Sequence, residues 1–213
     1  VWFYCLELKP TEQMEMLAGH TEENAPPTKE DYLKSNTKVH NSGFRFFDSR
    51  EYRSWEQHLD IIESSVNEHG FELLVIDNFH YLTRTNRNST EIEGVVSQRL
   101  KSLSQSCNIP ILLLHHLRKP ESDSTEPEPT VHAMRGASAI LNDASAVVLL
   151  HHPLADGQAD GSRQAVGRLR CDKSRWGTGG SKYVQLIGFK RKYIAASSLD
   201  YKKPRVSPRR KHE

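Results

Sequence analysis

Residues 71–80 read FELLVIDNFH, in which four apolar residues lead directly into an aspartate, Asp77. A short uninterrupted apolar run of this kind is typical of a strand buried on both faces, as in a parallel sheet covered by helices. In open α/β sheets, ligands bind beside the carboxyl ends of the strands. The stretch therefore predicts a buried strand that ends at a ligand-binding edge. The competing interpretation is that Asp77 only begins an Asx-turn.

Length and composition favour one α/β domain. The chain has 213 residues, enough for a substantial core, and its net charge of +2 identifies no partner. Three cysteines lie far apart without CxxC spacing, which fits a reducing cytosol. No stretch approaches the roughly 20 apolar residues that span a membrane. The chain begins at Val1, inside an apolar run and without an initiator Met, so we expect a fragment of a longer protein.

Strands and helices alternate along most of the chain. Apolar runs predict further strands, and a 3.6-residue periodicity predicts helices between them. The strands are expected at 1–6, 44–48, 109–114 and 146–150, with a closing pair at 166–171 and 183–189. The helices are expected at 9–17, 55–69 and 90–103, with a short helical pattern at 29–34. This alternation indicates a doubly wound, mostly parallel sheet flanked by helices. We assign residues 1–195 to this domain and residues 196–213 to a basic, disordered tail.

Three of the predicted strands end in candidate catalytic groups: Glu7, Asp77 and the pair His115-His116. Phosphate-ester hydrolysis needs a carboxylate that orients Mg²⁺, a carboxylate that activates water and a polar group at the γ-phosphate. Asp77, Glu7 and His116 match these roles in kind. A surface carboxylate at position 7, and a polar loop or zinc ligands at the two histidines, are the alternatives.

Two further features concern phosphate chemistry. Lys173 and Arg175, in a Gly-rich segment, are candidates to neutralise transition-state charge in a neighbouring subunit, although a solvated basic turn would look the same. The phosphate-binding pattern G-x-x-x-x-G-K-S/T is absent, and Gly179-Gly180-Ser181-Lys182 lacks its spacing. We therefore expect this chain alone to bind nucleotide poorly.

Taken together, the motifs resemble the motor domain of DnaB-type replicative helicases, on the RecA-like fold, including the phage primase-helicases. The matching stretches are YCLEL at 4–8, VIDNF at 75–79, ILLLHH at 111–116, RGASAI with DA at 135–144 and RCDKSR at 170–175. The segment HHLRK at 115–119 also resembles the RepA-like plasmid replication ATPases. In DnaB-type helicases the phosphate-binding loop precedes the strand that ends in the glutamate, which implies that the loop lies upstream of Val1.

The resemblance implies a role for each candidate residue. Glu7 would be the catalytic base, Asp77 the aspartate linked indirectly to Mg²⁺, and His116 the γ-phosphate sensor of bound ATP. Lys173 and Arg175 would act in trans across the interfaces of a hexameric ring. The implied single-stranded DNA contacts come from the loops that face the central channel, at Arg84, Arg87, Arg135 and Gly136. A primase and a helicase loader would be the further partners, in the cytoplasm, at the nucleoid or in a phage-infected host.

Two other functions remain open from the sequence. One is a non-catalytic nucleic-acid-binding or ring-scaffold module that lacks the phosphate-binding loop. The other is a RecA-like recombination or regulatory ATPase. The basic residues of the tail would add DNA affinity in any of these proteins, or remain a solvated end.

Overall fold

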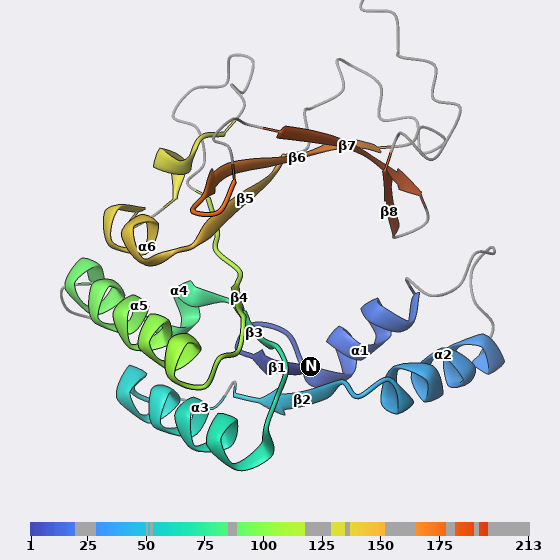
Figure 1. The fold of residues 1–213 in the computed structure, drawn as a ribbon. Coiled ribbons are helices and arrows are strands. Elements are labelled where there is room, and N and C mark those ends of the chain that lie inside the picture. The colour runs from blue at the N-terminus through green and yellow to red at the C-terminus, as the bar shows by residue number, and fades with distance from the viewer. Residues whose placement is uncertain are drawn as a thin grey trace, which may run out of the picture.

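The computed structural model describes residues 1–19, 29–49, 51, 53–84, 89–117, 129–134, 137–151, 165–177, 182–189 and 192–195, arranged around two four-stranded sheets (Figure 1). The first sheet and its helices consist of β1 (Trp2–Cys5), α1 (Pro10–Gly19), α2 (Lys29–Asn41), β2 (Arg45–Asp48), α3 (Trp55–His69), β3 (Leu74–Asp77), α4 (Phe79–Leu82), α5 (Ser89–Ser106) and β4 (Ile111–Leu113). The second sheet and its helices consist of the 3₁₀ helix η1 (Val131–Ala133), α6 (Ala137–Asp143), β5 (Ala146–His151), β6 (Ala165–Ser174), β7 (Lys182–Phe189) and β8 (Lys192–Ala195).

The first sheet is entirely parallel, in the order β2-β1-β3-β4. Its strands coincide with the predicted apolar runs, and Leu74, Val75 and Ile76 of β3 are each at most 4% exposed. The strand that precedes Asp77 is thus buried on both faces, as predicted. The predicted helical segment at 29–34 is shorter than α2, which continues to Asn41. The helix extends beyond the predicted end because Val39, 4% exposed, packs inward.

The second sheet is antiparallel, in the order β5-β6-β7-β8. The predicted closing pair forms β6 and β7, and β6 also pairs with β5. Residues 118–128, residues 152–164 and the predicted tail at 196–213 lie outside the described residues.

The core lies on one face of the first sheet. Alternate residues of β1 and β3, including Tyr4 and Ile76, face α3 and α5, which contribute Leu59, Ile62 and Val96 to the same cluster. α1 lies over the opposite face, where Gln13 reaches Asp77 (Figure 1). Helices therefore lie on both faces of this sheet, which confirms the predicted doubly wound arrangement.

The start of α3 illustrates how local sequence fixes an element. Ser54 is the N-cap, its hydroxyl accepts from the Gln57 backbone N–H, and the Gln57 side chain accepts from the Ser54 backbone N–H. This reciprocal capping box satisfies two otherwise unpaired donors. Gly70 ends the helix in the left-handed conformation, at φ 59°.

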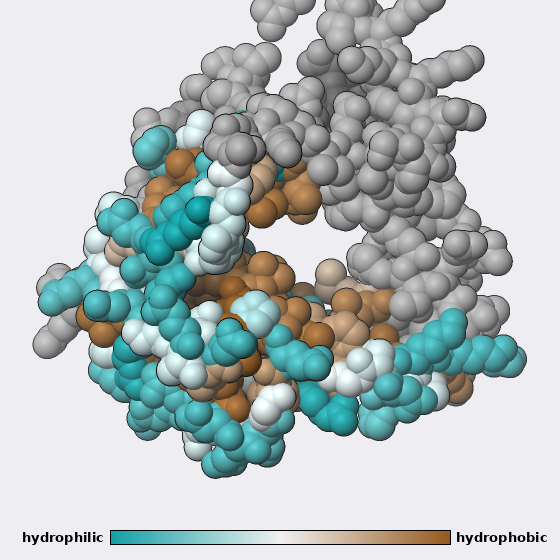
Figure 2. Space-filling view, in the orientation of Figure 1, coloured by the Kyte–Doolittle hydropathy of each residue, from teal (hydrophilic) through white to brown (hydrophobic). Residues whose placement is uncertain are grey.

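β4 is an edge strand of the first sheet and β5 is an edge strand of the second, and among the described residues neither has a partner on its outer side. The same holds for β2 and β8 at the opposite edges. On the face opposite the core, Leu112, Leu114, Val148 and Leu150 are between 40% and 55% exposed, an unusual exposure for a row of large apolar residues. In Figure 2, hydrophobic residues border an opening that lies between the part of the molecule built on the first sheet and the part built on the second sheet. A parallel sheet that is covered on both faces buries such side chains. The described residues therefore leave this part of the face uncovered.

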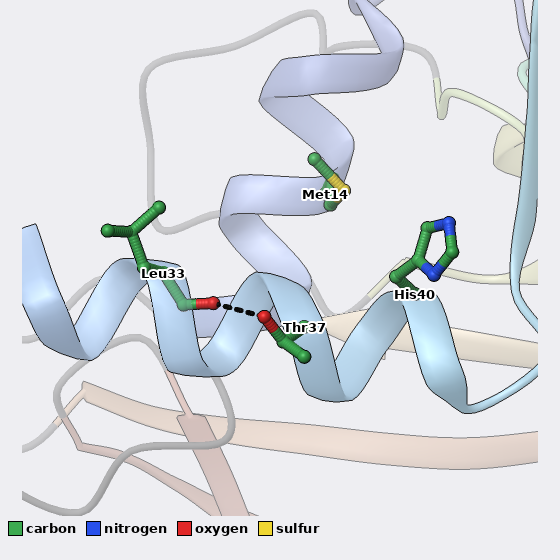
Figure 3. A pocket seen from close by; sticks show the side chains of 4 residues that line it. All are labelled: Met14, Leu33, Thr37 and His40. Atoms are coloured by element: carbon green, nitrogen blue, oxygen red, sulfur yellow. Dashed lines mark hydrogen bonds between the residues drawn. The ribbon is translucent and has the colours of Figure 1, made fainter.

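A small surface pocket lies between α1 and α2. Met14, Leu33, Thr37 and His40 line it, and the Thr37 hydroxyl donates to the Leu33 carbonyl at 2.8 Å (Figure 3). The pocket is open to solvent, and none of its four lining residues is among the predicted catalytic groups. Among the helices in the described ranges, none is long and apolar enough to cross a membrane.

A buried histidine links α3 to β1. The ring nitrogen Nδ1 of His58 lies 2.9 Å from the Tyr4 hydroxyl and 3.0 Å from the Ser49 hydroxyl. Burial, and then the nearby Arg53 cation, lower the pKa of His58 from 6.5 to about 4. The ring is therefore neutral in the folded protein at neutral pH, and Nδ1 is available to accept from a hydroxyl.

Acid should weaken the fold through His58. Because its pKa is lower in the folded protein than in the unfolded chain, stability from this group is complete above 6.5 and is lost as the pH falls towards about 4. At about 1.4 kcal/mol per pH unit, the full loss is about 3 kcal/mol. Urea unfolding across this window should give a steeper loss for the wild type than for His58→Gln. Parallel pH dependences would contradict this assignment.

Candidate active site at the sheet edge

The three predicted strand-end groups lie together at the carboxyl edge of the first sheet. Glu7 follows β1 by two residues, Asp77 ends β3 and His116 follows β4 by three. The parallel register pairs Cys5 with Asp77, so these ends are level. The His116 Nε2 atom lies 3.3 Å from the Glu7 carboxylate. His115 instead contacts the His116 carbonyl and the Phe79 ring.

Asn78 joins two of these groups. Its side-chain Nδ2 donates to Glu7 and lies 2.7 Å from His116 Nε2. Asn78 is 1% exposed, whereas the side chains of Glu7 and His116 are 34% and 57% exposed. The Asn78 amide is therefore buried, whereas the two side chains that it contacts reach solvent. Sequence reasoning did not select Asn78, although an amide directly after the strand-ending aspartate was a usable signal.

Asp77 has its own positioning contact. The buried side chain of Gln13, on α1, donates to Asp77 Oδ2. Burial raises the pKa of Asp77, the Gln13 hydrogen bond opposes that rise, and the Glu7 charge adds to it. Gln13 was also missed, because periodicity assigns it to a helix without showing which strand end that helix passes over.

Lys173 and Arg175 lie at the other sheet, at the end of β6. Lys173 Nζ donates to the Leu141 carbonyl and Arg175 donates to the Asn142 carbonyl, both in the last turn of α6. Cations at a helix C-terminus interact favourably with its unpaired carbonyls and dipole. Burial lowers the pKa of Lys173, and the neighbouring Arg175 charge lowers it further.

A third cation lies beside this pair. Lys101, on α5, donates to the Ser145 hydroxyl at 2.7 Å, while the Arg175 backbone N–H donates to the Ser145 carbonyl at 2.9 Å. Within the described residues, no hydrogen bond or ion pair connects Lys173 or Arg175 with Glu7, Asp77 or His116. The cationic pair and the acidic cluster are thus separate groups within one chain.

The predicted DNA contacts are only partly described. Arg84 is exposed and follows α4, which begins directly after Asn78. Arg87, Arg135 and Gly136 lie outside the described residues. In the part of the chain that is described, no group of three His, Cys, Asp or Glu side chains is arranged to hold a metal ion.

Two comparisons of the sequence with known proteins agree with each other. The family model described as "DnaB-like helicase C terminal domain" matches residues 21–195. The replicative DNA helicase DnaB of Mycobacterium leprae is 28% identical over 93 residues, a stretch that covers 43% of this chain and 15% of that relative. The match thus spans a minor part of the relative's length.

Solved structures share the fold. A DnaB-like replicative helicase, described with its interactions with primase, has a TM-score of 0.69 at 15% identity, and the match covers 91% of this chain and 51% of that chain. A solved ATPase domain has a TM-score of 0.72 at 15% identity and covers 91% and 73% of the two chains. The TM-scores establish a shared fold, and at 15% identity they show the fold alone; they confirm the predicted RecA-like α/β class.

Proposed function

Because this chain belongs to the family of DnaB-like helicase C-terminal domains, we propose that it is the motor of a replicative helicase that hydrolyses ATP at the interfaces of a ring of identical subunits. The observation that supports this most is the convergence of Glu7, Asp77 and His116 at one sheet edge. Ligands bind at such edges in open α/β sheets. The assignment as DnaB-type is favoured over RepA-type by the family match.

In the proposed reaction, Glu7 is the general base. Its partly exposed carboxylate accepts the proton of the water that attacks the γ-phosphorus of ATP. His116, which is more exposed and lies 3.3 Å from Glu7, contacts the γ-phosphate. Gln13, on α1, donates a hydrogen bond to Asp77. The Asp77 carboxylate would orient water bound to a metal ion.

The donor set fits Mg²⁺ in the indirect manner proposed. Mg²⁺ usually keeps several waters and uses one or two carboxylates together with substrate phosphates, and not a cage of protein ligands. Asp77 offers such a carboxylate. The ion would supply charge neutralisation across the β- and γ-phosphates.

The phosphate-binding loop is absent from residues 1–213, and the unpaired sheet edges support a site for it. A strand between β4 and β5 would pair with both edges. A right-handed crossover from that strand to β1 would put its helix on the face of α1, because the connection from β1 to β2 runs in the same direction. That face carries the exposed Leu112 and Val148. We propose that sequence outside residues 1–213 supplies this strand and helix, with the loop at their junction.

The remaining partners follow from the same proposal. Single-stranded DNA would bind along the ring channel through Arg84, Arg87, Arg135 and the backbone near Gly136. Such contacts to phosphates are sequence-tolerant and weaken as salt rises. A primase and a helicase loader would bind elsewhere on the assembled ring.

The test uses the full-length protein. We expect ATP hydrolysis that rises on addition of single-stranded DNA, with a stimulation that weakens at high salt. Size-exclusion chromatography with light scattering should report a ring at the same protein concentration. An assembled ring that carries a G-x-x-x-x-G-K-S/T loop, yet hydrolyses no ATP with or without DNA, would overturn the proposal and leave the non-catalytic module.

A further inference from the structure

Asn78 is held in one orientation. Its Oδ1 atom accepts from the Tyr81 backbone N–H at 3.3 Å, which caps the N-terminus of α4. A backbone N–H can only donate, so the oxygen of the amide must face Tyr81. The two N–H groups of the amide therefore point the other way, towards Glu7 and His116. Each hydrogen-bonding group of this buried side chain has a partner.

This orientation fixes how His116 is bonded. Since the amide nitrogen of Asn78 can only donate, His116 Nε2 must accept across the 2.7 Å contact. A neutral ring then carries its proton on Nδ1. The 3.3 Å approach of Nε2 to the Glu7 carboxylate is therefore a close contact without a shared proton. Glu7 and His116 are held beside each other by a common donor and not by bonding to each other.

We propose that Asn78 is a positioning residue that sets the water-activating carboxylate and the γ-phosphate-contacting imidazole at a fixed separation. This inference rests on the proposed function and adds to it the residue that organises the two groups. One amide bonds both, so displacing it moves both reactive groups together. The effect falls on the chemical step, because the groups that bind ATP outside this pair are untouched.

Two substitutions separate positioning from capping. Ser and Thr are favourable N-cap residues, so Asn78→Ser and Asn78→Thr keep the cap of α4. Neither offers an amide N–H pair to Glu7 and His116. A residue that only caps the helix would tolerate both changes. A positioning residue would tolerate neither.

The experiment measures steady-state ATP hydrolysis of the full-length protein, saturated with single-stranded DNA, for the wild type and both variants. We expect kcat to fall roughly 10- to 100-fold in each, the size of effect that a displaced catalytic group produces, with the KM for ATP within about twofold. The midpoints of thermal unfolding and the ring size should match those of the wild type. Asn41→Ser, at the exposed end of α2, serves as a matched control with wild-type kcat.

The outcomes separate the two proposals. Wild-type kcat in both Asn78 variants, with a fully active wild-type enzyme, would overturn the positioning role and leave the helicase function intact. A rise in KM at unchanged kcat would overturn it equally, because it would assign Asn78 to ATP binding. Absence of hydrolysis in the wild-type protein would instead contradict the proposed function itself.

Discussion

Replacing Glu7 with Gln should reduce DNA-stimulated ATP hydrolysis by about 10²- to 10⁴-fold, the usual contribution of a general base. The amide keeps the size of the side chain but cannot accept a proton from water. Glu7 is partly exposed at the edge of the sheet, so the substitution costs the fold little. The measurement is kcat for the full-length protein with saturating ATP and single-stranded DNA.

Glu72→Gln provides the matched control. Glu72 is an exposed carboxylate that precedes β3, at the opposite end of the strand from Asp77. It undergoes the same chemical change and loses the same charge, so it should hydrolyse ATP at the wild-type rate. ATP binding by the Glu7 variant should persist, since removing a base affects the chemical step. Full activity of Glu7→Gln would show that another group activates the water.

Much of the fold follows from local patterns, for reasons visible in the core. The run before Asp77 is apolar at every position because β3 is buried on both faces, and that is the pattern a parallel strand requires. The helical spacing of Leu59, Ile62 and Val66 predicts α3, since all three enter the same core. The full length of α2 was not predictable, because it depends on burial of Val39 in the tertiary structure.

The residues of the candidate site were likewise predictable only in part. Glu7 and Asp77 were recognisable because strand ends in a parallel sheet share an edge, so sequence position implies spatial position. Gln13 and Asn78 were missed because their importance depends on the direction of a side chain, which no periodicity encodes. The roles of these residues stay predictions until the activity of variants is measured.

The second large effect concerns Arg175, which we propose acts on the nucleotide of a neighbouring subunit. Arg175→Ala should lower kcat by roughly 10³- to 10⁵-fold, the range for a trans-acting arginine in phosphoryl transfer. The cation neutralises charge that develops on the phosphoryl oxygens only in the transition state, so the KM for ATP should change far less. Arg45→Ala, which removes another exposed arginine, is the control and should retain full activity.

Mixed rings test whether the action is in trans. In a ring with head-to-tail interfaces, a subunit with Arg175→Ala still supplies Glu7, and a neighbour with Glu7→Gln still supplies Arg175. Some interfaces of a co-expressed mixture would then hold one intact copy of each group, so hydrolysis should return although each variant alone is inactive. If Arg175 served its own subunit's site, every site in the mixture would lack one group, and no activity would return. Restored activity would also show that Arg175→Ala subunits fold, because they contribute the intact base, even though this change removes the hydrogen bond to the Asn142 carbonyl at the end of α6.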